Sequence, residues 1–257
     1  MNLSIEGKNV VVTGGSKGIG LSIAKIFLEE GAKVTITGRN QTNLDRAAEE
    51  LKSYQTSLRM ISGDLQNPND RETLFQQCSD ADILVNNAGA IKGGGIQDLT
   101  MEDWREGWEL KVFGYIHLCK LFTKIMCERK SGTIINIIGM GGRHTQPSYI
   151  CGAGGNAALI GFTQALGAGT AKDNVRVFGI NPSATLTDRM IGLLKRKAEL
   201  EAGDPNLWEQ YTSQDQLPFG RMQHADEIGN LAVMLSSPKV QYLSGTVVDS
   251  SGGGEWK

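Results

Sequence analysis

Short runs of β-branched residues alternate with longer amphipathic stretches along the whole chain. The runs are nearly continuous in Val and Ile, which is typical of strands covered by helices on both faces. They cover residues 9–13, 33–37, 57–61, 82–85, 133–138, 176–180 and 246–248. The stretches between them have apolar residues at helical spacing, over 19–30, 41–53, 71–78, 101–129, 156–171 and 225–235. This alternation predicts an α/β fold, a single-domain Rossmann-type doubly wound parallel sheet of about seven strands with helices on both faces, over residues 1–257.

One segment, residues 188–217, departs from the alternation of strand and helix. Its apolar residues have helical spacing, but it carries many charges. It follows the predicted strand at 176–180, so it lies near the carboxyl ends of the strands, where ligands of such sheets bind. We therefore predict a helical flap that takes part in substrate selection.

Composition and charge exclude several classes of protein. Glycine is enriched, with 33 Gly in 257 residues, while only six prolines are present, which indicates tight turns and close backbone approach rather than a linker. The net charge of −2 gives no basic surface for nucleic acid. Glu6 and Lys8 interrupt the start where a signal peptide needs an apolar run, and no run reaches the ~20 apolar residues of a membrane span. We expect a cytoplasmic protein that binds neither nucleic acid nor membranes.

The four cysteines, Cys78, Cys119, Cys127 and Cys151, show no CxxC pair and no metal-ligand spacing. Buried cysteines behave as small hydrophobic residues. We therefore predict neither a metal site nor a disulfide framework.

A glycine-rich turn follows the first predicted strand and runs straight into a helix. It reads TGGSKGIG over residues 13–20. Glycines let the backbone approach a pyrophosphate closely, and the free amides at a helix N-terminus favour negative charge. The predicted cofactor-binding residues of this turn are Gly14, Ser16, Lys17, Gly18, Ile19 and Gly20.

This turn matches the TGxxxGxG pattern of the short-chain dehydrogenase/reductase family. Further motifs of that family follow in the same order: Asp64-Leu65, Asn86-Asn87-Ala88-Gly89, Asn181-Pro182, Thr187-Asp188 and Ser244-Gly245-Thr246. The chain thus resembles the family over essentially its whole length.

The resemblance implies a nicotinamide cofactor and a small-molecule substrate with a carbonyl or alcohol group. In the family, the positions of Asp64 and Leu65 contact the adenine, Asn87, Ala88 and Gly89 form the motif after the fourth strand, and Pro182 and Thr187 flank the nicotinamide. Family members also assemble as dimers or tetramers through the helices that correspond to 101–129 and 156–171. A homodimer or homotetramer is therefore expected.

The choice between the two nicotinamide cofactors depends on charge after the second strand. An NAD site needs a carboxylate there for the ribose 2′-OH, whereas a 2′-phosphate needs cations. Here Arg39 and Asn40 follow Thr37-Gly38, with no acid, and Lys17 lies in the glycine turn. The sequence predicts NADP(H), although Lys17 and Arg39 can also be read as ordinary surface charges.

The catalytic end departs from the family pattern. The positions of the family's Asn, Ser, Tyr and Lys are occupied by Lys111, Gly139, Gly152 and Asn156. A positioned general acid contributes about 10² to 10⁴ in rate and an oxyanion donor about 10² to 10³, and glycine supplies neither from a side chain. Asn156 retains an amide that can hydrogen-bond a cofactor ribose. The two glycines predict a wider pocket, and the run from 152 to 155 predicts a loose helix start.

Three residues are candidate catalytic substitutes. Tyr149 precedes Gly152 by one helical turn, Lys111 is a cation in a region that the family keeps polar, and His144 lies in the expected substrate loop. Each also has an ordinary explanation: Tyr149 as a wall or cap, Lys111 as a lysine extending to solvent, and His144 as an incidental loop residue.

Three functions stay open. The first is an NADP(H)-binding oxidoreductase in which Tyr149 is the acid and Lys111 or His144 assists. The second is a catalytically inactive member, either a nucleotide-responsive regulator or a structural subunit in a hetero-oligomer with an active homologue. The third is a lyase or isomerase that uses a bound nicotinamide as a fixed electrostatic element or a transient hydride store.

Overall fold

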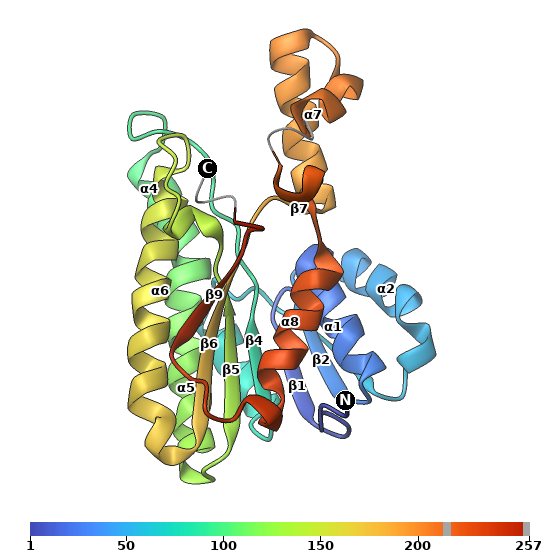
Figure 1. Ribbon diagram of the computed structural model, residues 1–257, viewed down its shortest axis with the longest axis vertical. Coiled ribbons are helices and arrows are strands. Elements are labelled where there is room, and N and C mark those ends of the chain that lie inside the picture. Colours follow the sequence, from blue (N-terminus) through green and yellow to red (C-terminus); the bar gives the residue numbers. More distant parts are fainter. Residues whose placement is uncertain (213–216, 254–257) are drawn as a thin grey trace.

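The seven β-branched runs form one parallel sheet in the computed structural model, which describes residues 1–212 and 217–253 (Figure 1). The order is β3-β2-β1-β4-β5-β6-β9. The order reverses between β1 and β4, which defines a doubly wound sheet and confirms the predicted fold class. The strands are β1 (Asn9–Val12), β2 (Lys33–Gly38), β3 (Leu58–Ser62), β4 (Ile83–Asn86), β5 (Gly132–Ile137), β6 (Val175–Pro182) and β9 (Thr246–Ser250).

Helices cover both faces of the sheet (Figure 1). Alternate residues of β1 show this, because Val10 and Val12 pack with Phe27 on one face and Val11 packs with Phe122 on the other. One layer holds α1 (Gly18–Glu29), α2 (Gln41–Glu50) and α8 (Ala225–Ser236), and the other holds α3 (Pro68–Gln77), α5 (Gly114–Glu128) and α6 (Ile150–Thr170). Because the two layers cover the sheet, every residue of β1, β4 and β5 is buried except the first residue of β1 and of β5, which are half-buried.

The helix predicted over 101–129 is interrupted. It consists of α4 (Met101–Trp108), a π-helical segment (Glu109–Phe113) and α5. A π-helical turn fits one extra residue into a helix and is frequently found at functional sites. This π-helical segment carries Lys111. The side chain of Lys111 therefore points in a direction that a regular α-helix over 101–129 would not predict.

The helix predicted over 156–171 begins six residues earlier than expected, at Ile150. The run from 152 to 155 is part of a continuous helix, and the looseness expected of its start stays a prediction. The first turn is anchored because Cys151 and Ala153 are buried. Gly155 lies close to Val112, such that a Cβ at position 155 would stand 3.1 Å from the valine side chain. The glycines therefore permit close packing between α6 and its neighbours.

The segment predicted as a flap contains α7 (Asp188–Ala202) and a 3₁₀ segment (Pro205–Thr212), while residues 213–216 of that prediction lie outside the described residues. Figure 1 shows α7 standing away from the sheet, beyond the carboxyl ends of the strands. Its base is joined to the body by the short parallel pair β7 (Thr185–Leu186) and β8 (Gln223–His224). The role of this segment as a flap stays a prediction.

None of the helices in the described part of the chain is long and apolar enough to cross a membrane. All four cysteines are free, and Cys78, Cys119 and Cys151 are buried.

Candidate functional site

A cavity of about 770 Å³ lies at the carboxyl ends of the strands. Its walls come from the turns after β1, β2, β4 and β5, from the end of β6 and from the first turn of α7. It therefore spans the point between β1 and β4 where the strand order reverses, which is where ligands bind in open α/β sheets.

The glycine-rich turn forms one end of this cavity by local geometry. Gly14 and Gly18 have positive φ angles of 64° and 57°, which favour glycine. Gly20 is required by a close approach, because a Cβ there would stand 2.3 Å from the Gly14 carbonyl oxygen. Lys17 precedes α1 without a side-chain cap, so the first amides of the helix are left open for an anion.

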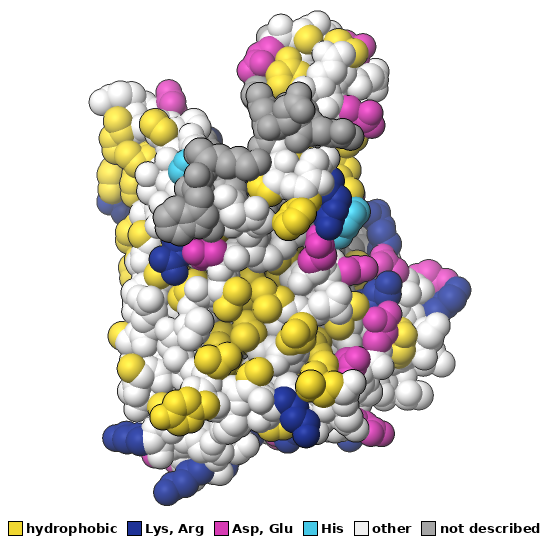
Figure 2. Space-filling view, viewed as in Figure 1, with side chains coloured by type: hydrophobic (Ala, Val, Ile, Leu, Met, Phe, Trp, Pro, Cys, Tyr) yellow, Lys and Arg dark blue, Asp and Glu magenta, His cyan; other side chains and the backbone are white. Residues whose placement is uncertain are grey.

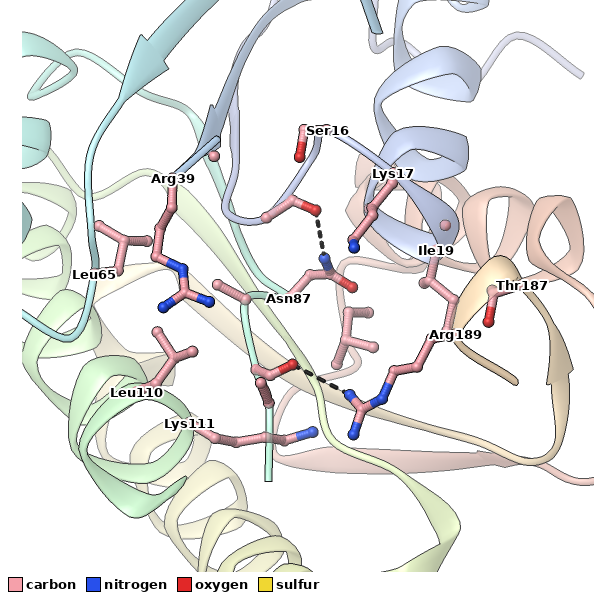
Figure 3. Close-up of a pocket in the computed structure, with 18 of the residues that line it drawn as sticks. Ser16, Lys17, Ile19, Arg39, Leu65, Asn87, Leu110, Lys111, Thr187 and Arg189 are labelled. Carbon is pink, nitrogen blue, oxygen red and sulfur yellow. Dashed lines mark hydrogen bonds between the residues drawn. The ribbon is translucent and has the colours of Figure 1, made fainter. Parts of the chain in front are cut away.

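The loop after β4 is fastened to the glycine-rich turn by hydrogen bonds. Asn87 donates from Nδ2 to the carbonyl oxygens of Thr13 and Gly14, at 3.0 and 3.1 Å (Figure 3). The Thr13 hydroxyl accepts from the backbone N–H groups of Asn87 and Ala88, at 2.9 and 3.1 Å. Two motifs that are far apart in the sequence thus form one rigid wall.

All the predicted cofactor residues except Asn156 line this single cavity. These are Gly14, Ser16, Lys17, Gly18, Ile19, Gly20, Arg39, Asn40, Asp64, Leu65, Asn87, Ala88, Gly89, Pro182 and Thr187. The structure brings them together, and their role in binding stays a prediction.

Two exposed cations line the cavity, one in the glycine-rich turn and one after β2. Lys17 and Arg39 both line it, and Figure 3 shows both side chains as part of its lining. Arg39 Nη1 lies 3.7 Å from Asp64 Oδ2, and these side chains are 58% and 44% exposed. An ion pair as exposed as this is weak, so Arg39 can leave Asp64 to bind another anion. Asn40 also caps α2, because its side chain accepts from the Asn43 amide at 3.0 Å.

Lys111 forms part of the opposite end of the cavity. Its Nζ donates to the Ile138 carbonyl oxygen at 2.6 Å, and its aliphatic chain lies against Gly89, where a Cβ would stand 2.8 Å from Cδ. The side chain is directed into the cavity wall rather than toward solvent. Burial and, to a smaller degree, the charge of Arg189 lower the pKa of Lys111 to about 8.

Arg189 is a cavity residue that the sequence reasoning missed. It lies in the first turn of α7 and donates to the carbonyl oxygens of Gly89 at 3.4 Å and Ile91 at 3.3 Å, across the cavity (Figure 3). The signal available in the sequence was its position directly after Thr187-Asp188, at the start of the charged segment.

Tyr149 lies beside the cavity and is not one of its lining residues. It precedes α6 and is half-buried, with its ring close to the backbones of Gly141 and Gly152. A Cβ at Gly152 would stand 2.0 Å from Tyr149 Cζ and 2.5 Å from its hydroxyl oxygen. The ring therefore fills much of the space that the sequence predicted to be empty. Burial raises the pKa of Tyr149, and the charge of Arg189 opposes this in part.

Asn156 and His144 do not line the cavity that contains Lys111. Asn156 is only 2% exposed, and its Nδ2 lies 3.2 Å from the position of a Cβ on Gly139. His144 is exposed and lines a second cavity of about 380 Å³, which adjoins the first at Ser183. The structure therefore does not bring the three candidate catalytic residues into one cavity.

Comparisons with known proteins agree with the fold and with the family that the sequence motifs resemble. Residues 8–198 match the family described as short chain dehydrogenase. The chain is 31% identical to dehydrogenase/reductase SDR family member 4 of Caenorhabditis elegans, over 96% of this chain and 95% of that protein. It is 30% identical to L-sorbose reductase from Gluconobacter frateurii, solved with NADPH and L-sorbose, with a TM-score of 0.91 and all of both chains covered. A 7α-hydroxysteroid dehydrogenase solved with NADH is 27% identical, with a TM-score of 0.85 over 98% of this chain and 96% of that one.

Proposed function

The chain belongs to the short-chain dehydrogenase family, and on this premise we propose that it is an NADP(H)-dependent oxidoreductase acting on a small carbonyl or alcohol compound. The observation that carries the proposal is the cavity lined by the glycine-rich turn with Lys17, by Arg39 after β2 and by the loop after β4. These residues fit a dinucleotide, because the turn offers free helix amides and glycines that admit a pyrophosphate.

Charge around the cavity favours NADP(H) over NAD(H). No acidic residue directly follows β2, and Lys17 and Arg39 can both reach a 2′-phosphate from the cavity wall. The NADPH complex of the L-sorbose reductase supports this choice, whereas the NADH complex of the hydroxysteroid dehydrogenase shows that similar folds also use the other cofactor.

The proposed chemistry uses a relocated proton donor. A bound nicotinamide supplies or accepts a hydride. Tyr149 gives the proton on its hydroxyl oxygen to the alkoxide that forms when a carbonyl is reduced, and it regains a proton from water. The support for this role is the absence of a side chain at Gly152, which leaves room for the ring of Tyr149, the residue that precedes α6. Because its pKa is raised, the phenol is protonated at neutral pH.

Lys111 assists at the same end of the cavity, where its ammonium helps to orient the substrate. His144 is the other candidate for an assisting acid, and its place in the adjoining cavity gives it access only to a larger substrate. The proposal includes a second point: four positions at which the family has catalytic residues hold other residues here. They are Lys111, Gly139, Gly152 and Asn156.

A catalytically inactive subunit is the second candidate function. The observation that favours it is that Tyr149 and the buried Asn156 do not line the cavity. Figure 2 shows hydrophobic side chains gathered over the face that carries α8 and β9, and this part of the chain includes the exposed Met234 and Leu243. Such a surface suits assembly with a second copy or with an active homologue.

The first test is a titration with NADPH and, separately, NADH, following energy transfer from the four tryptophans to the nicotinamide. We expect saturable binding with preference for NADPH, followed by oxidation of NADPH in the presence of a carbonyl substrate. Binding of NADPH without turnover of any carbonyl compound, together with recovery from cells in complex with a homologue, would favour the inactive subunit. Substrate conversion without a net change in cofactor absorbance would instead indicate a lyase or isomerase.

A further inference from the structure

Two cations at one end of the cavity have no acidic partner among the described residues. Lys111 bonds only to the carbonyl oxygen of Ile138, and Arg189 bonds only to those of Gly89 and Ile91. Figure 3 shows the two side chains extending from different elements toward the same end of the cavity. We call Lys111 and Arg189 the cation pair.

Of the three other cations that line the cavity, Lys17 is exposed and forms no ion pair among the described residues, whereas Lys92 and Arg39 are paired. Lys92 is paired with Asp103 at 2.9 Å, and Arg39 lies 3.7 Å from Asp64. The carboxylate nearest in sequence to the pair, Asp188, forms no ion pair with either cation in the part of the chain that the structure describes. The pair therefore places two cations without ion pairs at one end of the cavity.

Keeping the half-buried Lys111 charged near the exposed Arg189 is unfavourable. The lowered pKa of Lys111 reflects this cost, because both burial and the charge of Arg189 disfavour its ammonium. A neutral donor would serve the single bond to Ile138 without that cost. The positive charge is explained if it meets an anion in the functional complex.

The pair is also held by other segments than the surface that fits a pyrophosphate. That surface is the N-terminus of α1 and the glycine-rich turn, whereas the cation pair is held by the segments after β4 and β5. Gly89 and Gly139, which border this end of the cavity, have no side chains, so a small ligand can approach both cations.

We propose that Lys111 and Arg189 together bind a carboxylate of the substrate, so that this protein acts on small oxo acids or hydroxy acids rather than on neutral carbonyl compounds. A planar guanidinium and an ammonium each give charge-assisted hydrogen bonds to carboxylate oxygens. The inference rests on the proposed function for the reaction of the carbonyl group, but the binding of the carboxylate itself requires no turnover.

The test is calorimetric titration with three acids whose carboxylate lies at increasing distance from the carbonyl: 2-oxobutanoate, 3-oxobutanoate and 4-oxopentanoate. Each is compared with its neutral amide, with and without saturating NADP⁺. We expect at least one acid to bind about tenfold or more tightly than its amide. Lys111→Met and Arg189→Gln should each weaken binding of that acid by about ten- to hundredfold and leave the amide unchanged.

Lys92→Met is the matched control, because this lysine lines the same cavity but is already paired with Asp103. It should leave acid binding unchanged, and near-ultraviolet circular dichroism of each variant checks its fold. Arg189→Gln gives an independent result if Lys111→Met fails to fold.

The inference is overturned if all three acids bind no better than their amides, or if the two substitutions weaken NADPH binding alone, in which case the pair serves the cofactor. These outcomes are distinct from failure of the proposed function. Acid preference without any nucleotide binding would remove the oxidoreductase and keep the carboxylate site, whereas tight NADPH binding without acid preference would do the reverse.

Discussion

The two ends of the cavity are built from different parts of the chain. The end beside α1 is made largely of backbone: glycines with positive φ, free helix amides and a loop fastened by Asn87. The end beside α6 is made of side chains from separate elements, with Lys111 from the π-helical segment and Arg189 from α7. The first end can be recognised as a short pattern of residues, whereas the second depends on which elements lie opposite each other.

This difference implies that the two ends can be disabled separately. Changes to the backbone turn should impair nucleotide binding and spare the chemistry of the other end. Changes to Tyr149 or Lys111 should impair turnover or substrate binding and spare nucleotide affinity.

The largest effect is expected for Tyr149→Phe. The variant keeps the ring that packs against Gly152 and loses only the hydroxyl group that we propose as the proton donor. Turnover should fall at least about hundredfold. Steady-state kinetics give the turnover number, and a parallel NADPH titration gives the nucleotide affinity, so the two ends are tested in one variant. An unchanged turnover number would show that Tyr149 is only a wall of the site.

A pair of glycine substitutions compares the two ends directly. In Gly20→Ala the new Cβ meets the rigid Gly14 carbonyl oxygen at 2.3 Å, and in Gly152→Ala it meets the Tyr149 ring at 2.0 Å. Overpacking of this kind costs about 1–3 kcal/mol. We expect Gly20→Ala to weaken NADPH binding and Gly152→Ala to lower turnover.

Gly161→Ala is the control for both glycine substitutions. It lies within α6, and a Cβ there would have no neighbour within 4 Å. Alanine is favoured over glycine in a helix by up to about 1 kcal/mol, so this variant should raise the thermal midpoint slightly. Equal losses of NADPH affinity in Gly20→Ala and Gly152→Ala would contradict the separation of the two ends.

A smaller effect is expected for Arg39→Gln. The substitution removes one cation that can meet a 2′-phosphate, and the weak pair with Asp64 contributes little to folding. The dissociation constant for NADPH should rise by about tenfold, while that for NADH stays the same. An equal change for both nucleotides would show that Arg39 does not read the 2′-position.

The dependence of acid binding on pH should be the most gradual effect. Lys111 has a pKa lowered to about 8, so its ammonium is present below that pH and lost above it. The dissociation constant for the acid that binds should rise by up to about tenfold per unit above pH 8, and that of its amide should stay constant. The pKa values of Tyr115 and Tyr149, which lie beside Lys111 and Arg189, are raised, so these phenols do not titrate in this range. Lys111→Met should abolish the dependence.

The strands and the glycine-rich turn could be predicted from sequence because their signals are local. Val10, Val11 and Val12 are apolar because both faces of β1 are covered, and Gly14, Gly18 and Gly20 are needed by the backbone of the turn itself. The helix boundaries were less accurate. The start of α6 at Ile150 depends on burial of Cys151 and Ala153 by other elements, which the run of glycines concealed.

The sequence by itself therefore determined the doubly wound sheet, the nucleotide turn and the absence of an acid after the second strand. Only the tertiary structure decided that the Tyr149 ring lies against Gly152, that Asn156 is buried behind Gly139 and that Arg189 crosses to Gly89. The physical reason is range. Backbone conformation and hydrophobic periodicity are set by neighbours within a few residues. The contacts of Asn156 with Gly139 and of Arg189 with Gly89 instead join residues that are far apart in the sequence. The contact of Tyr149 with Gly152 is short in sequence, but it depends on where α6 begins, and packing against other elements fixes that start.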